Sequence, residues 1–234
     1  MARMQRRHVL AATVAAAALL ATGCSGDSGS GGTPQERLAA AQAKVEAAEA
    51  ITIALTSKDV PSNVNGVQAA TGTGVVDGET RKFEGEFQGR VAGVTATAGI
   101  LAIDDQAWMK LFTPEYSPID LDELGAPNPT SFFADDTGVA SLLSATTDLS
   151  EGGQVREGRE ILSTINGSLP GEKVESLLRL GGPGTTFDVS YGLTEDDELR
   201  KAVLTGEFYE GRDSTYTLLL TDYGKTVAIE APTS

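Results

Sequence analysis

The chain has 234 residues, and its 40% hydrophobic and 22% charged residues are typical of a globular protein that buries a core, which excludes disorder throughout. The length suits one large domain with appendages better than two large domains. A formal net charge of -15, with no cluster of lysine and arginine in the sequence, repels phosphate backbones and excludes nucleic-acid binding.

The chain opens with a basic stretch and then an uncharged run from Val9 to Ala21. This run fits the roughly 7–15 residues of a signal-peptide core and is shorter than the roughly 20 of a membrane-spanning helix. It is followed by Thr22-Gly23-Cys24, which with Leu20-Ala21 resembles the bacterial lipobox, whose cysteine thiol accepts diacylglycerol. We therefore expect a signal peptide over 1–23, a lipidated Cys24 with a flexible Ser/Gly tether over 24–33, and a single domain over 34–234. The export route, general or twin-arginine, stays open.

The only histidine, His8, and the only cysteine, Cys24, both lie in this leader. After processing, the chain holds no histidine, and its one cysteine is acylated. Serine or cysteine nucleophiles activated by histidine, zinc sites of histidine or thiolate, thiol redox centres and disulfides are then excluded. Removal of three arginines and no acid leaves 15 basic residues against 33 acidic ones, a net charge of -18. We expect no enzyme activity, no cofactor and no metal.

A helix is predicted directly after the tether. Thr33-Pro34-Gln35-Glu36 has the pattern of a capping box with proline in the first helical position. Leu38, Ala41, Val45 and Ala48 then recur at spacings of three and four, which gives a thin apolar stripe. We expect this helix to end near Ala50.

From Ile51 the hydrophobic period becomes two, which predicts strands. The clearest is 81–91, where Phe83, Gly85, Phe87, Gly89 and Val91 share one face and charged or polar residues occupy the other, as in a half-buried antiparallel strand. Further strands are predicted over 51–56, 67–76, 93–103, 107–112, 154–157, 160–168, 185–193, 199–209, 214–221 and 226–230. Together they predict a highly twisted antiparallel sheet of many strands.

Two helical patches and one long connection interrupt the strands. Residues 136–147 and 170–180 place leucines and valines at helical spacing, and Gly181-Gly182 ends the second patch. The segment 113–130 contains four prolines and four acidic residues and is longer than most connections in compact domains. It is either a lid or a disordered excursion.

The order of these segments resembles the LppX/LprAFG lipoproteins, with LprG-like members, which are lipid-binding proteins of the mycobacterial-type cell envelope. The stretch 100–111, with Asp104-Asp105 between two strands, is similar to the family's apolar strand, aspartate turn and following strand. Residues 115–120 resemble its tyrosine-containing segment, and 135–143 resemble its aspartate-threonine-glycine helix start, the most specific match. Residues 225–229, after Gly224, are similar to its last strand.

The resemblance implies an α+β fold, a twisted antiparallel half-barrel with helices on its concave face that enclose an apolar cavity, as in LolA and LppX. Family members are linked to carrying triacylated lipids or glycolipids between membranes, often alongside an export pump, and no family motif is catalytic. The expected partners are an acylated lipid or glycolipid and the membrane that holds the anchor. We expect a monomer on the extracytoplasmic face of the cell membrane. The candidate cavity mouth is Tyr116, and the candidate cavity residues are Phe83, Gly85, Phe87, Gly89, Val91, Ala96, Ala98, Ile100, Phe132, Phe133, Leu142 and Leu143.

The residues alone leave other interpretations open. The glycines and alanines of the predicted cavity either leave room for a lipid or relieve crowding in a close-packed core. Phe132-Phe133 either line a lid or anchor the next helix, and Trp108 is more typical of core than of a site. The acidic groups at 104–105, 120–123 and 195–198 offer oxygen ligands or a glycosidase pair, but turn positions favour solvated acids.

Three classes of function therefore remain. A lipid carrier predicts extractable lipid, and a surface interaction or adhesion module predicts a compact core. A carboxylate-dependent glycan hydrolase predicts turnover that depends on one carboxylate pair.

Overall fold

The computed structural model describes residues 31–91 and 94–233. Its helices are α1 (Pro34–Glu46), α2 (Val139–Ala145) and α3 (Gly171–Leu178), with a 3-10 helix η1 (Pro129–Phe133). The first six strands are β1 (Ala50–Lys58), β2 (Gly66–Asp77), β3 (Thr80–Val91), β4 (Val94–Ile103), β5 (Gln106–Lys110) and β6 (Ser117–Ile119). The remaining strands are β7 (Thr147–Glu157), β8 (Glu160–Pro170), β9 (Thr186–Leu193), β10 (Leu199–Tyr209) and β11 (Arg212–Thr221).

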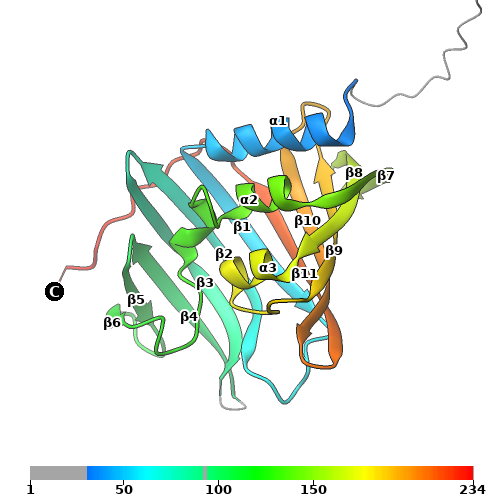
Figure 1. Cartoon of the computed structure of the whole chain (residues 1–234). Helices are drawn as coiled ribbons and strands as arrows, with labels where there is room; N and C mark the ends of the chain where they lie inside the picture. The colour runs from blue at the N-terminus through cyan, green and yellow to red at the C-terminus, as the bar shows by residue number, and fades with distance from the viewer. Residues whose placement is uncertain (1–30, 92–93, 234) are drawn as a thin grey trace, which may run out of the picture.

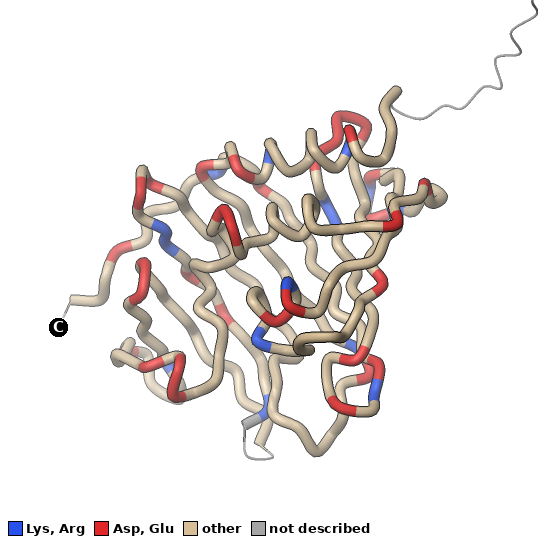
Figure 2. Tube along the Cα trace, in the orientation of Figure 1, with Lys and Arg blue, Asp and Glu red and all other residues tan. Residues whose placement is uncertain are grey.

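All strands belong to one sheet of 11 strands in the order β6-β5-β4-β3-β2-β1-β11-β10-β9-β8-β7. Every pairing is antiparallel, and β1 joins the two halves by pairing with both β2 and β11. The sheet does not close, so β6 and β7 are its edges, and the helices lie across one face (Figure 1). Figure 2 shows that most acidic residues lie in turns and loops around this sheet. The predicted antiparallel half-barrel with helices on one face is confirmed.

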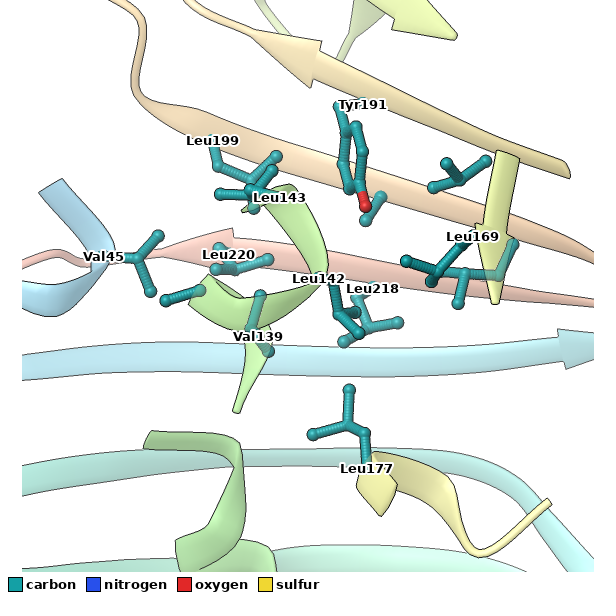
Figure 3. Close-up of a cluster of buried hydrophobic side chains, with 14 of the residues drawn as sticks. Val45, Val139, Leu142, Leu143, Leu169, Leu177, Tyr191, Leu199, Leu218 and Leu220 are labelled. Atoms are coloured by element: carbon teal, nitrogen blue, oxygen red, sulfur yellow. The ribbon is translucent and has the colours of Figure 1, made fainter. Parts of the chain in front are cut away.

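The face of the sheet that the helices cover is called the helix face here, and the opposite one the outer face. Leu142 and Leu143 of α2 and Val174 and Leu177 of α3 pack onto it, together with Leu38, Ala41 and Val45 of α1. They meet inward side chains of β1 and β8–β11, and this cluster is almost fully buried (Figure 3). Burial of each such leucine contributes about 1.5–3 kcal/mol, so this cluster holds the helices on the sheet.

The predicted capping box forms as expected at the start of α1. The Glu36 backbone N–H donates to Thr33 Oγ1 at 3.3 Å, and the Thr33 backbone N–H donates to Glu36 Oε2 at 2.9 Å. Pro34 occupies the first helical position. The helix ends at Glu46, earlier than predicted, because Ala50 already begins β1 and pairs with Val75.

Two further predicted elements differ from the structure. Helix α2 ends at Ala145, because Thr146 is extended and its hydroxyl donates to the Leu142 carbonyl, so that β7 begins at Thr147. The prediction of a strand over 226–230 is wrong, because these residues pair with no described strand of the sheet. This tail instead crosses the outer face, where Ile229 packs against Ala50, Val75 and Leu101.

The connection over 113–130 follows a defined path. It contains β6, which pairs with β5, and it ends in η1, where the Asn128 side chain caps the first turn by accepting from the Thr130 N–H at 3.0 Å. The Asn128 amide also donates to the Asp104 carbonyl at 2.7 Å. Asp122 pairs with Arg179, directly after α3. The connection therefore runs from the β6 edge to the helix face and is held at several points.

Candidate functional site

The candidate lipid-contacting residues of β3 and β4 share the helix face. The register pairs Phe83 with Ala102, Gly85 with Ile100, Phe87 with Ala98 and Gly89 with Ala96. Directly paired residues point to the same side of a sheet, and Phe83 also pairs with Gly74, which in turn pairs with Ile51 of the buried cluster. The period-two pattern of 81–91 therefore predicted the correct face. The side chain of Val91 lies outside the described residues.

The helix face has a filled half and a thinly covered half. Over β1 and β8–β11 the three helices bury the inward side chains, and Leu142 and Leu143 belong to this filled half. Over β3–β5 only η1 and the chain leading to it lie in front of the sheet (Figure 1). Phe87 and Ala96 are only half-buried there, whereas Ala98 and Ile100 are buried. The candidate site is the surface around Phe87 and Ala96.

The glycines near this site lie close to other parts of the chain. A side chain on Gly74 would overlap the Phe133 ring, and one on Gly85 would meet the Thr71 carbonyl and the Gly72 backbone. At these positions glycine allows close packing, and Phe133 anchors η1 on β2. A Cβ on Gly89 would meet only neighbouring backbone, with the Gly66 carbonyl oxygen 3.0 Å away. Gly89 is itself buried, so at all three positions glycine allows close packing.

Tyr116 lies on the outer face, away from the candidate site. Its ring packs against the cluster of Ala50, Val75, Leu101 and Ile229, and its hydroxyl donates to Glu84 Oε1 at 3.4 Å. Burial raises the pKa of Tyr116. The predicted place at a cavity mouth does not fit, because the whole sheet separates Tyr116 from the helices. Trp108 packs in the same outer cluster, in agreement with the interpretation as core.

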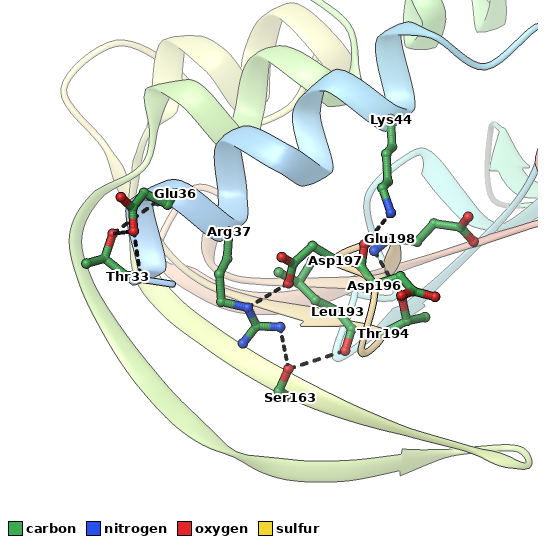
Figure 4. A network of polar contacts seen from close by, with 10 residues as sticks. All are labelled: Thr33, Glu36, Arg37, Lys44, Ser163, Leu193, Thr194, Asp196, Asp197 and Glu198. Carbon is green, nitrogen blue, oxygen red and sulfur yellow. Dashed lines mark hydrogen bonds and ion pairs between the residues drawn. The ribbon is translucent and has the colours of Figure 1, made fainter. Parts of the chain in front are cut away.

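A polar network fixes the opposite end of the molecule. Arg37 of α1 donates to Asp197 at 2.6 Å and to the Ser163 hydroxyl at 2.7 Å, and Lys44 donates to the Asp196 carbonyl (Figure 4). This network ties α1 to the β9–β10 turn and to β8. No local pattern predicts that Arg37 is buried, because its partner Asp197 is 160 residues away.

Two surface hollows lie away from the candidate site. One, of about 560 Å³, lies beside this network and is lined mainly by charged side chains, among them Lys44, Glu160, Glu198 and Arg200. The other, of about 430 Å³, lies between the C-terminal tail and the β2–β3 turn. None of the predicted cavity residues lines either hollow.

The acidic groups of the sequence lie in connections, as their turn interpretation predicted. Asp104-Asp105 form the β4–β5 turn, and 195–198 form the β9–β10 connection. Within 31–91 and 94–233, no three acidic, histidine or cysteine side chains are grouped so that they could hold a metal ion.

The comparisons with known proteins agree with this geometry. The family model of the LppX_LprAFG lipoprotein matches residues 33–229. This chain belongs to that family. Among solved structures, LprF from Mycobacterium bovis superposes with a TM-score of 0.74 at 11% identity, over 86% of this chain and 97% of LprF. The Mycobacterium tuberculosis lipoprotein LppX gives a TM-score of 0.61 at 14% identity, over 84% of this chain and 98% of LppX.

The two superpositions show a shared fold. A comparison with curated protein sequences found no match. The family is one of lipoproteins, and the predicted signal peptide and Cys24 lie outside the described residues. In the described part of the chain, no helix is long and apolar enough to cross a bilayer.

Proposed function

We propose that this protein is a cell-envelope lipoprotein that binds the acyl chains of lipids or glycolipids and carries them between membrane layers. Cys24 would anchor it in the cell membrane on the extracytoplasmic face, with an export pump as a further partner. The acyl chains would lie on the helix face of β3 and β4, beside η1. Of the other predicted lipid contacts, Phe132 of η1 would border this position, whereas Leu142 and Leu143 lie in the filled half.

The observation that carries the proposal is the thin cover over β3 and β4 in a member of a lipoprotein family. Phe87 and Ala96 remain partly exposed there, while the helix face over β1 and β8–β11 is filled. An acyl chain of about 16 carbons gains on the order of 10 kcal/mol on leaving water, at roughly 0.8 kcal/mol per CH₂. Binding therefore needs little more than an apolar surface that can enclose the chain, and we expect loose headgroup selectivity.

Adjacent positions on β4 allow a matched test. Ala96 is half-buried on the helix face, and Thr97 is exposed on the outer face. We expect Ala96→Trp to lower lipid occupancy severalfold, because its indole takes the space of the acyl chain, and Thr97→Trp to leave occupancy unchanged. Occupancy is measured by mass spectrometry of lipid extracted after native purification, and thermal unfolding of the delipidated variants is the control. Equal occupancy in the two variants would contradict the position of the site.

Substitution of Cys24 tests whether this residue anchors the protein in the membrane. We expect Cys24→Ala to leave the protein unprocessed or in the aqueous phase of a detergent partition, because loss of the thiol removes every acyl chain attached there, each worth roughly 0.8 kcal/mol per buried CH₂. Cys24→Ser, which keeps the size of the side chain, should behave in the same way. Membrane partitioning of either variant like the parent would rule out anchoring at Cys24.

A second candidate function is a surface-anchored interaction module. It is favoured by the close packing beneath α1, α2 and α3, and by the polar lining of the larger hollow. The two functions differ in one measurement: the module predicts no lipid above background in the purified parent protein, and the carrier predicts a stoichiometric amount.

A further inference from the structure

Two large apolar side chains project into solvent from the connection between β5 and η1. Phe112 is 91% exposed and Leu124 is 54% exposed. Single exposed apolar residues are common on proteins. An aromatic ring that is almost fully exposed, however, contributes none of the hydrophobic free energy that its burial would supply. Two such residues in one connection point to a surface that is covered when the protein acts.

The backbone at Phe112 is also unusual. Its φ is 63°, in the left-handed region that disfavours residues with a side chain. Phe112 directly follows Leu111, where the chain leaves β5 to turn toward β6, and this conformation directs the ring away from the sheet. Such backbone strain tends to persist where function requires it.

Both residues lie at the end of the sheet that the candidate lipid site approaches. Lys110 pairs with Gly99, so the chain that continues to Phe112 runs toward Ala96 and the exposed Val94 at the start of β4. The ion pair of Asp122 with Arg179 holds the chain next to Leu124 at the C-terminal end of α3. Just after α3, the Gly181 N–H donates to the Phe208 carbonyl at 3.3 Å, close to the β10–β11 turn.

The predicted membrane tether begins at the other end. Helix α1 is fixed to the β9–β10 turn through Arg37 and Asp197, and the chain from Cys24 to Pro34 spans at most about 35 Å. The exposed residues therefore face away from the point of attachment. They can meet a facing lipid layer, or the anchoring layer once the domain lies down on it.

The negative charge of the connection between β5 and η1 determines which lipid surfaces it can approach. Glu115, Asp120, Asp122 and Glu123 lie between Phe112 and Leu124, and no lysine or arginine does. An anionic surface would repel this connection, and a neutral or zwitterionic one would not.

We propose that Phe112 and Leu124 form a lip that inserts into a neutral or zwitterionic lipid surface, beside the place where cargo reaches β3 and β4. Insertion is inferred from the exposure of these two side chains. A role of the lip in cargo exchange rests on the proposed function.

Vesicle binding tests the lip directly. The protein used begins at Ser25, so it keeps every described residue and has no anchor. We expect it to sediment with phosphatidylcholine vesicles, and the Phe112→Ser/Leu124→Ser variant to bind about tenfold or more weakly, because two apolar side chains no longer leave water. Vesicles that contain phosphatidylglycerol should bind the parent less well at low salt, with the difference lost at high salt.

Val155→Ser is the matched control, because Val155 is also exposed, at 39%, but lies on β7 at the opposite edge of the sheet. It should bind like the parent. The lip is overturned if the parent does not bind the vesicles, if the double variant binds equally well, or if Val155→Ser loses as much binding. It is also overturned if the double substitution abolishes a dimer in sedimentation velocity, which would assign the surface to a second copy.

Lipid occupancy of the same samples tests the carrier function separately. Vesicle binding without bound cargo would support the lip and contradict the carrier function.

Discussion

Replacing Asp197 with alanine should lower the free energy of unfolding by about 3 kcal/mol or more. The substitution removes the partner of Arg37, whose side chain is 6% exposed, whereas that of Asp197 is 21% exposed. A buried charge that loses its partner keeps its desolvation penalty and loses the attraction that offset it, and such losses are typically about 3–5 kcal/mol. Urea unfolding followed by circular dichroism measures the change.

The neighbouring aspartate is the control for this prediction. Asp196 contributes its backbone carbonyl to Lys44, and its side chain is exposed, so Asp196→Ala should change stability by less than about 0.5 kcal/mol. A double variant, Arg37→Met with Asp197→Leu, should recover much of the loss, because it removes both charges together. Equal stability of Asp197→Ala and Asp196→Ala would show that the ion pair does not hold α1 in place.

Leu142→Ala should destabilise the protein by about 2–5 kcal/mol. Leu142 is fully buried at the centre of the filled half, between α2 and the sheet (Figure 3). The loss combines the transfer free energy of the removed methyl groups with the cavity that remains, since the surrounding strands cannot fully collapse onto it. The measurement is again the free energy of unfolding, with lipid extracted first so that bound cargo does not mask the change.

Ser144→Ala on the same helix isolates the effect of burial. Ser144 is exposed, and alanine suits a helix, so this variant should unfold within about 0.5 kcal/mol of the parent. A loss below about 1 kcal/mol for Leu142→Ala would mean that the filled half is loosely packed. The helices could then lift easily from the sheet to admit lipid there as well.

Local patterns determined the elements whose signals lie within a few residues. The capping box from Thr33 to Glu36 set the start of α1, because its hydrogen bonds join residues three apart. Alternation along 81–91 determined which side chains of β3 face the helices, because successive side chains in a strand point to opposite faces. Cys24 and the apolar run before it predicted a lipoprotein, and the family match agrees.

The tertiary structure alone decided which surfaces are filled and which are open. Period-two alternation separates the two faces of a strand, but it does not say what covers each face. The resemblance implied a cavity mouth at Tyr116, yet the fold places this residue on the outer face. The apolar pattern of 226–230 predicts a strand, yet these residues pair with no strand that the structure describes, and Ile229 instead packs its side chain on the outer face. Arg37 is buried because it meets Asp197, which is distant in the sequence, and Phe112 is exposed because no other described part of the fold covers it. No local sequence pattern encodes either outcome.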